Sequence, residues 1–333
     1  MSELERHLLN ARMLDPARGE ETTTRIELRI DPLTGHGSRV LPDRGLMPRS
    51  DFDLAALARE TAPTCPFCAE RIEHLTPLWP ASIEAIGRFS HGEAVLFPNL
   101  HAYATYSAVS VYSPDLHYLP LAAISERLLA DNLATQVSFA RAVLAADAAA
   151  RWASINANHM LPSGSSLFHP HLQGIVDHHP TTMQRLLAGL AAERFTAYLD
   201  AERRAGERYL GNTGAVEWLV SFAPIAPAEL RAFIPDRVSP SQLDTALTTE
   251  LAHGLALALG AYSEMGFESF NLALYGAPAD TTGYMLNLRL AARSNLKNLY
   301  RSDSTFLERL HWEGAVDIAP EHVAELIGDR FKL

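Results

Sequence analysis

The chain has 333 residues, of which 47% are hydrophobic and 20% charged, values typical of a water-soluble protein with one large or two ordinary domains. No apolar run approaches the roughly 18 residues of a membrane span, and the opening residues contain no apolar signal segment, so we predict a cytoplasmic protein without membrane contact. With 28 Lys and Arg against 39 Asp and Glu the net charge is −11, and no basic cluster suggests a nucleic-acid partner.

The first third of the chain predicts loops, a hairpin and one long helix. Residues 1–64 are rich in turn formers around a short β-type piece at residues 25–30. Two β-rich stretches between residues 94 and 112 predict a hairpin or two adjacent strands, because a Pro-Asn pair interrupts them. Residues 122–152 carry apolar side chains at helical spacing in an alanine-rich segment, which predicts a long helix.

The next segment predicts strand, loop and strand, with SINAN at residues 154–158, then LPSGSS, then HLQGIVD at 171–177. A second long helix is expected at residues 182–209, whose many charges indicate one solvated face. The remainder repeats the order strand, long helix, strand, strand. We therefore predict an α+β fold of two similar halves, residues 1–185 and 186–333, with two antiparallel sheets and flanking helices.

The segment between the two strands concentrates the reactive side chains. Pro170 separates His169 from His171 and favours extended backbone, so both imidazoles are expected on one side of the chain. Gln173, two residues further along the strand, lies on that same side. Backbone N–H groups and hydroxyls just upstream suit a phosphate, and they belong to Gly164, Ser165 and Ser166. The alternative is a pair of ordinary histidines, buried or on the surface.

The only two cysteines, Cys65 and Cys68, form a CPFC pair. Such a pair is typical of a metal site or of a redox centre. Redox pairs of the thioredoxin type open a helix within a βαβ unit, and none is evident in this sequence.

Together these motifs resemble the galactose-1-phosphate uridylyltransferase family, the transferase branch of the histidine-triad-like superfamily. HPHLQ at residues 169–173, preceded by GSS and by Asn158, resembles the family's active-site segment. Gln173 stands where hydrolases of the superfamily carry a third histidine. Four further motifs follow the family's order and approximate spacing: DPLTG followed by Arg44, CPFC, FPN ending at Asn99, and SPDLH ending at His117. The resemblance covers residues 31–173 and implies a duplicated histidine-triad-like fold.

The resemblance implies a structural Zn²⁺ held by Cys65, Cys68, His117 and His169. Two thiolates and two imidazoles suit tetrahedral zinc, and four protein ligands leave no open position for a substrate water. The inserted Leu116 places His117 one residue further from SPD than in the family.

The resemblance also implies that His171 is a nucleophile, which attacks the α-phosphorus of a nucleoside diphosphate compound and forms a nucleotidyl-histidine. Gln173 can donate a hydrogen bond to a phosphoryl oxygen but has no titratable proton with which to activate water. Substrate contacts are expected from Arg44, Asn99, Asn158, Ser165 and Ser166. An ordinary surface arginine is the alternative reading of Arg44. Where many members have a second arginine this chain has Met47, with Arg49 as a substitute.

We therefore predict an enzyme, a nucleotidyltransferase that works by a ping-pong mechanism on a nucleotide-sugar or another nucleotide conjugate and a phosphate-bearing acceptor. A phosphorylase or hydrolase using the same histidine is one alternative. A nucleotide-binding protein that has lost catalysis is the other. By analogy with relatives, we expect a homodimer.

Overall fold

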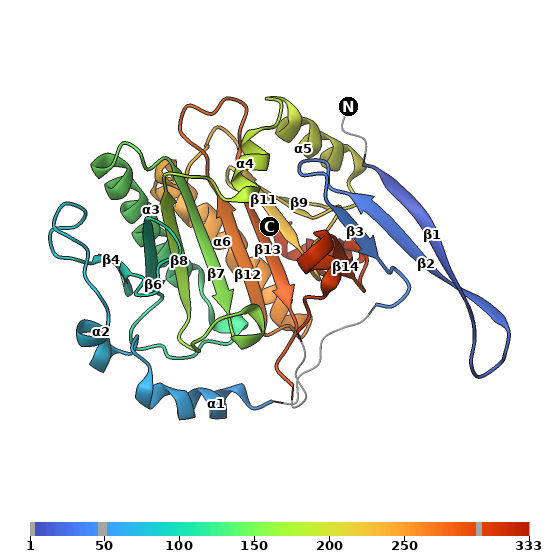
Figure 1. The fold of residues 1–333 in the computed structure, drawn as a ribbon, viewed down its shortest axis with the longest axis horizontal. Coiled ribbons are helices and arrows are strands. Elements are labelled where there is room, and N and C mark those ends of the chain that lie inside the picture. Colours follow the sequence, from blue (N-terminus) through green and yellow to red (C-terminus); the bar gives the residue numbers. More distant parts are fainter. Residues whose placement is uncertain (1–3, 46–51, 298–301, 333) are drawn as a thin grey trace.

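The computed structural model describes residues 4–45, 52–297 and 302–332, and its central feature is a ten-stranded sheet that both halves of the chain build together (Figure 1). Every neighbouring pair of strands in it is antiparallel. From edge to edge the strands are β4 (Phe89–His91), β5 (Ala94–Pro98), β6 (Tyr106–Val111), β8 (His171–Asp177), β7 (Trp152–His159), β12 (Ser269–Tyr275), β13 (Leu286–Arg293), β11 (Leu230–Ile234), β10 (Val216–Val220) and β9 (Tyr209–Thr213). The predicted α+β class is confirmed, and the two halves meet where β7 pairs with β12.

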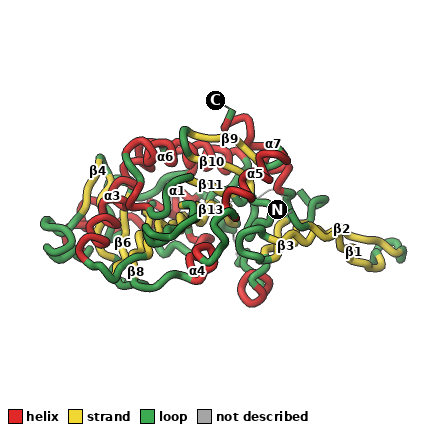
Figure 2. Tube along the Cα trace, turned by 90° about the horizontal axis from the view of Figure 1, so that it is seen from above, coloured by secondary structure: helices red, strands yellow, loops and turns green. Residues whose placement is uncertain are grey.

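Two long helices, α3 (Glu126–Ala146) and α6 (Thr245–Glu264), cover one face of this sheet (Figure 2). Each begins at a side chain that accepts a hydrogen bond from the first turn, Ser125 for α3 and Asp244 for α6. Their apolar sides and the sheet enclose the main hydrophobic core, which includes the fully buried Trp218. None of the helices in the described ranges is long and apolar enough to cross a membrane.

A smaller, four-stranded sheet lies beside the second half. Its strands, in order, are β1 (Arg6–Leu14), β2 (Glu21–Ile30), β3 (Gly37–Val40) and β14 (Gly314–Val316). β1 and β2 project from the body as a two-stranded ribbon (Figures 1 and 2). The shorter helices include α1 (Leu54–Thr61), α2 (Ala69–Leu75) and α7 (Pro320–Ile327).

The single long helix expected at residues 182–209 is wrong. The structure has two helices there, α4 (Thr182–Ala188) and α5 (Arg194–Ala205). Gly189 is the C-cap of α4, and a glycine inside a helix costs about 1 kcal/mol relative to alanine, which favours an end at this point. The predicted boundary at residue 185 lies inside α4, and the division into halves at that point stays a prediction.

Asp31, the first residue of DPLTG, ties the small sheet to the large one. Its Oδ2 accepts hydrogen bonds from Arg231 at 3.0 Å and from Arg289 at 3.1 Å. Its Oδ1 accepts the backbone N–H groups of the following turn, from Leu33 and Thr34. Burial opposes ionisation of this carboxyl, but the two guanidinium groups together outweigh it and hold the pKa of Asp31 well below its usual range.

We expect Asp31→Asn to lower the free energy of unfolding by about 3–5 kcal/mol, because it leaves the buried Arg231 without its counter-charge and Arg289 with Glu229 alone. The measurement is urea unfolding, with Asp43→Asn at an exposed carboxylate as the matched control. The folded-state pKa is lowered, so this stabilisation is complete above the unfolded pKa and is lost as the pH falls. The difference between wild type and variant should therefore shrink below about pH 4. A variant as stable as the control would contradict this role.

Candidate active site and metal centre

The HPH segment lies on the face of the large sheet that α3 and α6 leave open. Pairing of β7 with β8 sets Asn156 directly beside Gln173. Because side chains alternate along a strand, Asn158 and His171 project from the same face, whereas Leu172 points into the core on the opposite side. The predicted strand–loop–strand is thus confirmed, and it lines up four polar side chains on adjacent strands.

His171 is held as a neutral imidazole with one free nitrogen. Its Nδ1 lies 2.8 Å from the carbonyl oxygen of His169, and since a carbonyl only accepts, Nδ1 carries the proton. The lone pair is then on Nε2, which lies 3.5 Å from the side-chain nitrogen of Gln173. The residue is 8% exposed, and this burial lowers the pKa of His171. The arrangement presents a nucleophilic nitrogen next to an amide donor.

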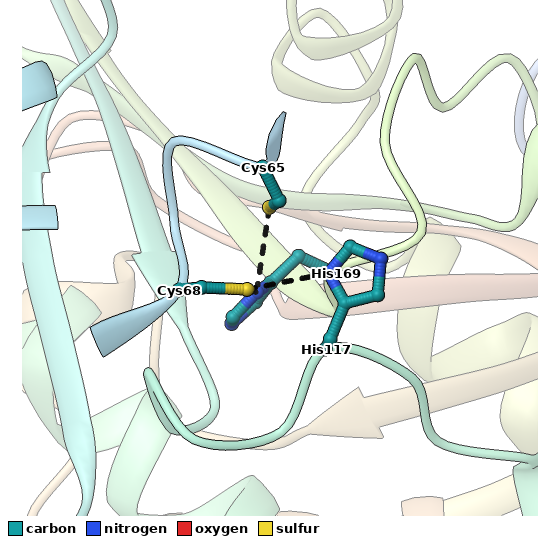
Figure 3. A group of neighbouring side chains, drawn as sticks. All are labelled: Cys65, Cys68, His117 and His169. Atoms are coloured by element: carbon teal, nitrogen blue, oxygen red, sulfur yellow. Dashed lines mark hydrogen bonds between the residues drawn. The ribbon is translucent and has the colours of Figure 1, made fainter. Parts of the chain in front are cut away.

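Four side chains converge behind this histidine: Cys65, Cys68, His117 and His169 (Figure 3). Their ligand atoms all lie within 4.8 Å of one another. The Nδ1 of His169 is 3.7 Å from each sulfur, and the Nδ1 of His117 is 3.4 Å from the sulfur of Cys68. Tetrahedral bonds of about 2.3 Å to sulfur and about 2.0 Å to nitrogen separate such atoms by roughly 3.6 Å. The cluster therefore has the donors and the size for a tetrahedral metal ion.

Neighbouring groups hold both metal-site histidines in the tautomer that a metal needs. The Nε2 of His169 donates to the carbonyl oxygen of Ser113 at 2.9 Å. The Nε2 of His117 donates at 2.9 Å to the hydroxyl of Thr61, whose own proton goes to the carbonyl oxygen of Ala58. Both Nδ1 lone pairs consequently face the sulfurs. Neither Thr61 nor Ser113 belongs to a metal-binding motif, so their contacts with the two histidines could not be predicted from the sequence.

The electrostatics of the cysteine pair also suit a cation. Burial and the neighbouring Cys65 raise the pKa of Cys68 to about 11. Two adjacent thiolates are therefore unfavourable without a positive charge between them.

Phe67 links the metal cluster to His171. Its ring meets those of His169 and His171 edge-on, at centroid distances of 6.0 and 5.6 Å. The same ring packs against Phe97 in the sheet. The two imidazoles thus face one side of the chain, as predicted, and the loop between the cysteines sets the position of both. Sequence reasoning used only the cysteines of CPFC and missed the aromatic residue between them.

The loop before HPH places its two serines differently. Gly164 adopts a left-handed conformation with φ of 96°, which turns the chain after the short helical turn Leu161–Ser163. The hydroxyl of Ser165 is buried and donates to the carbonyl oxygen of Leu167 at 2.7 Å. Ser166 is exposed. The predicted phosphate cradle therefore has one hydroxyl engaged within the loop and one on its surface.

Asn158 is held by the second half of the chain, through a residue that sequence reasoning missed. The side-chain nitrogen of Asn271 donates to the Oδ1 of Asn158 at 2.6 Å and to the carbonyl oxygen of Ser163 at 2.9 Å. The Oδ1 of Asn271 accepts from Arg293, which in turn pairs with Asp303. The feature of the sequence that could have indicated this role is the single asparagine within the apolar stretch SFNLALY.

Asn271 also lines a cavity of about 350 Å³. Its charged and aromatic lining consists of Arg293, Asp303, Glu308, Arg309, Trp312 and Glu313. The cavity therefore adjoins the residues around HPH and offers both acidic and basic groups.

The two remaining predicted substrate residues lie further from HPH. Asn99 follows β5, two strands from β8, and its Oδ1 accepts the N–H of His101. Arg44 is exposed and its guanidinium lies 3.3 Å from Asp317, on the side of the small sheet. The structure does not bring Arg44 into the group formed by His171, Gln173 and Asn158. Met47 and Arg49 lie outside the described residues.

Solved structures of other proteins have the same overall fold as this chain. The chain matches an ADP-glucose phosphorylase from Arabidopsis thaliana, solved with bound ADP-glucose, with a TM-score of 0.66, 16% identity and coverage of 91% of this chain and 99% of that one. It matches a uridylyltransferase with a TM-score of 0.59, 18% identity and coverage of 97% and 99%. The chain has the uridylyltransferase fold. The resemblance seen in HPHLQ is confirmed at the level of fold, over both halves.

A third similar structure with the uridylyltransferase fold is a GalT-like protein from Arabidopsis thaliana, with a TM-score of 0.66, 15% identity and coverage of 91% and 98%. In sequence, the chain is 29% identical over 324 residues to an uncharacterized protein from Archaeoglobus fulgidus, which covers 95% of each. No protein-family model matches the chain.

We expect Asn271→Ala to lower the free energy of unfolding by about 1–3 kcal/mol, because it leaves the Ser163 carbonyl and the Asn158 side chain without their shared donor. Thermal or urea unfolding measures the loss. Asn212→Ala, which removes only a local bond to Gly214 on the surface, is the control. Equal stability of the two variants would show that the link between the halves contributes nothing.

Proposed function

We propose that the protein is a nucleotidyltransferase, which moves a nucleoside monophosphate from a nucleotide-sugar type of donor to a phosphate-bearing acceptor through a covalent bond to His171. The observation that carries this proposal is the neutral His171 ring, whose free Nε2 faces the amide of Gln173. The similar solved structures include a uridylyltransferase and an ADP-glucose phosphorylase, which supports phosphoryl chemistry on a nucleotide conjugate.

In the first displacement the Nε2 lone pair of His171 attacks the α-phosphorus. A P–N bond forms as the bond from phosphorus to the leaving phosphate oxygen breaks. The ring keeps its Nδ1 proton, which donates to the His169 carbonyl and stabilises the positive charge on the imidazole. In the second displacement an oxygen of the acceptor phosphate attacks the same phosphorus. The P–N bond breaks and neutral His171 returns.

Gln173 favours transfer over hydrolysis. Its amide can donate to a phosphoryl oxygen in both displacements, where charge spreads over the oxygens of the transferred group. It cannot take a proton from water near neutral pH. Asn158 and Ser166 add donors for the phosphates, and Asn99 and Arg44 are kept as proposed contacts of the nucleotide and its phosphates.

We assign the cysteine–histidine cluster to a structural Zn²⁺. Four protein ligands fill a tetrahedral coordination sphere, so the ion would hold the CPFC loop against the HPH segment rather than bind substrate. Phe67 would carry that constraint to His171, since its ring contacts both histidines.

The cavity beside Asn271 is the proposed place for the part of the substrate that lies beyond the transferred phosphoryl group. Its mixture of carboxylates, arginines and the aromatic Trp312 suits a polar organic group such as a sugar phosphate. A phosphorylase would use the same histidine with inorganic phosphate as the acceptor. In that case only the donor would place an organic group in this cavity. The homodimer and the cytoplasmic location stay predictions.

Incubation with a panel of nucleoside diphosphate sugars should add the mass of one nucleoside monophosphate to the protein, detected by intact mass spectrometry. His171→Ala should lose both this adduct and turnover, because it removes the attacking nitrogen. Gln173→His should still form the adduct but release more of the nucleotide to water, because an imidazole can act as an acid and a base.

The two variants thus separate the proposed roles. An adduct that persists in His171→Ala would place the covalent step elsewhere. A wild-type protein that binds nucleotide but forms no adduct with any donor would favour the non-catalytic binding protein. Transfer to inorganic phosphate in preference to a sugar phosphate would identify a phosphorylase.

The protein as isolated should contain about one equivalent of Zn²⁺, and Cys65→Ser should lose the metal together with stability. Thr61→Val should weaken metal affinity by about 10–100-fold, because it removes the hydroxyl that orients His117. Competition with a chromophoric chelator measures the affinity. Thr64→Val, at an exposed hydroxyl in the same loop, serves as the control. Fully active protein that lacks zinc would contradict a structural zinc site.

A further inference from the structure

The four residues of the metal cluster (Figure 3) are not equally shielded from solvent. Cys65 and His169 are 2% and 0% exposed, whereas Cys68 and His117 are partly exposed. A cavity of about 360 Å³, separate from the one beside Asn271, lies against the cluster. Of the four cluster residues, all within the described ranges, only Cys68 lines it. The cluster is therefore open to small molecules on one side, the side of Cys68.

The walls of this cavity carry both positive and negative charges. Arg59 and Arg71 are balanced by Glu70 and Asp115, and Arg71 lies 3.4 Å from Glu70. A cavity of this size has room for several molecules the size of water, each of which takes up about 30 Å³ in the liquid. We therefore expect small uncharged reagents to reach Cys68 from solvent.

Cys65 is placed to form a disulfide with Cys68. Pro66 and Phe67 form a turn between the two cysteines. The end residues of such a turn have Cα atoms less than about 7 Å apart, which is compatible with the separation that a disulfide requires. Their sulfurs belong to a set of ligand atoms that all lie within 4.8 Å of one another. The chain has no other cysteine, so within one molecule these two can pair only with each other.

We propose that Cys68 is a modification site, at which a hydroperoxide such as hydrogen peroxide oxidises the cluster and releases its metal. The Cys68 thiolate attacks one peroxide oxygen, the O–O bond breaks, hydroxide leaves, and Cys68 becomes a sulfenic acid. The Cys65 thiolate then attacks the Cys68 sulfur, so that an S–S bond forms and a second hydroxide leaves. Two electrons pass from the sulfurs to the peroxide, and the metal ion loses two of its four ligands. The proposal rests on the metal site assigned above and not on nucleotide transfer.

Oxidation reaches the proposed nucleophile through the turn between the cysteines. The ring of Phe67 contacts those of His169 and His171, and a disulfide changes the turn that carries this ring. Loss of the metal also releases His169, whose carbonyl oxygen accepts the Nδ1 proton of His171. The modification thus disturbs the position and the tautomer of His171 without any reagent at His171 itself.

Treatment of the zinc-loaded full chain with hydrogen peroxide tests the proposal without a measurement of activity. A chromophoric chelator should report the release of about one equivalent of Zn²⁺. Peptide mass spectrometry should show a disulfide between Cys65 and Cys68, about 2 Da lighter than the two thiols. In a brief reaction, a reagent that traps sulfenic acids should label Cys68. Dithiothreitol with added zinc should restore both the thiols and the bound metal.

Two variants test the route through the cavity. Ala62 lines the cavity, so Ala62→Phe should slow zinc release severalfold because it narrows access to Cys68. Ala55→Phe makes the same change at an exposed position of α1 outside the cavity lining and should leave the rate unchanged. Equal rates in the two variants would overturn the assignment of this cavity as the route.

The remaining outcomes separate this proposal from the metal assignment. A chain that binds no zinc would overturn both. A zinc-loaded chain that keeps its metal in peroxide sufficient to oxidise a free thiol such as glutathione would overturn this proposal alone. A sulfenic label on Cys65 in place of Cys68 would do the same.

Discussion

Two backbone carbonyl groups decide the chemistry of the HPH segment, because each determines which nitrogen of an imidazole carries the proton. The Ser113 carbonyl takes the Nε2 proton of His169 and leaves its Nδ1 to face the cysteine sulfurs. The His169 carbonyl takes the Nδ1 proton of His171 and leaves its Nε2 beside Gln173. One short extended segment thus carries both the candidate metal ligand His169 and the proposed nucleophile His171. With the opposite tautomers, neither the metal site nor the attack on phosphorus could form.

The open face of the large sheet differs between the two halves. Along one row, Gln173 and Asn156 on adjacent strands are followed by Ala273 and then by Arg289. In the first half this row carries uncharged polar groups close to a free imidazole nitrogen. In the second half the charge of Arg289 is neutralised by the buried Asp31. On this row the second half therefore presents no free charge, and it reaches the HPH segment through Asn271, which also lines the cavity.

Local chemistry could be predicted from the sequence, and distant contacts could not. The cluster of Cys65, Cys68, His117 and His169, which the family resemblance implied, comes together in the structure although an inserted residue changes the spacing of His117. The bond between Asn158 and Asn271 joins strands that are over a hundred residues apart, and its partner is an ordinary amide in an apolar strand. Arg44 was predicted as a substrate contact from a local motif, and a local motif does not indicate where the small sheet, which carries Arg44, lies relative to the HPH segment. The helix break at Gly189 was missed because the charged side chains on which the helix prediction rested continue on the far side of the glycine.

The central claim is that the nucleotide passes through two displacements at one phosphorus, the first by His171. The most direct test is the stereochemical course of the overall transfer, followed with a donor whose α-phosphorus is made chiral by a sulfur substitution. Each in-line displacement inverts the configuration, so transfer through a nucleotidyl-histidine predicts overall retention. Inversion would mean a single direct displacement by the acceptor and would contradict the covalent role of His171.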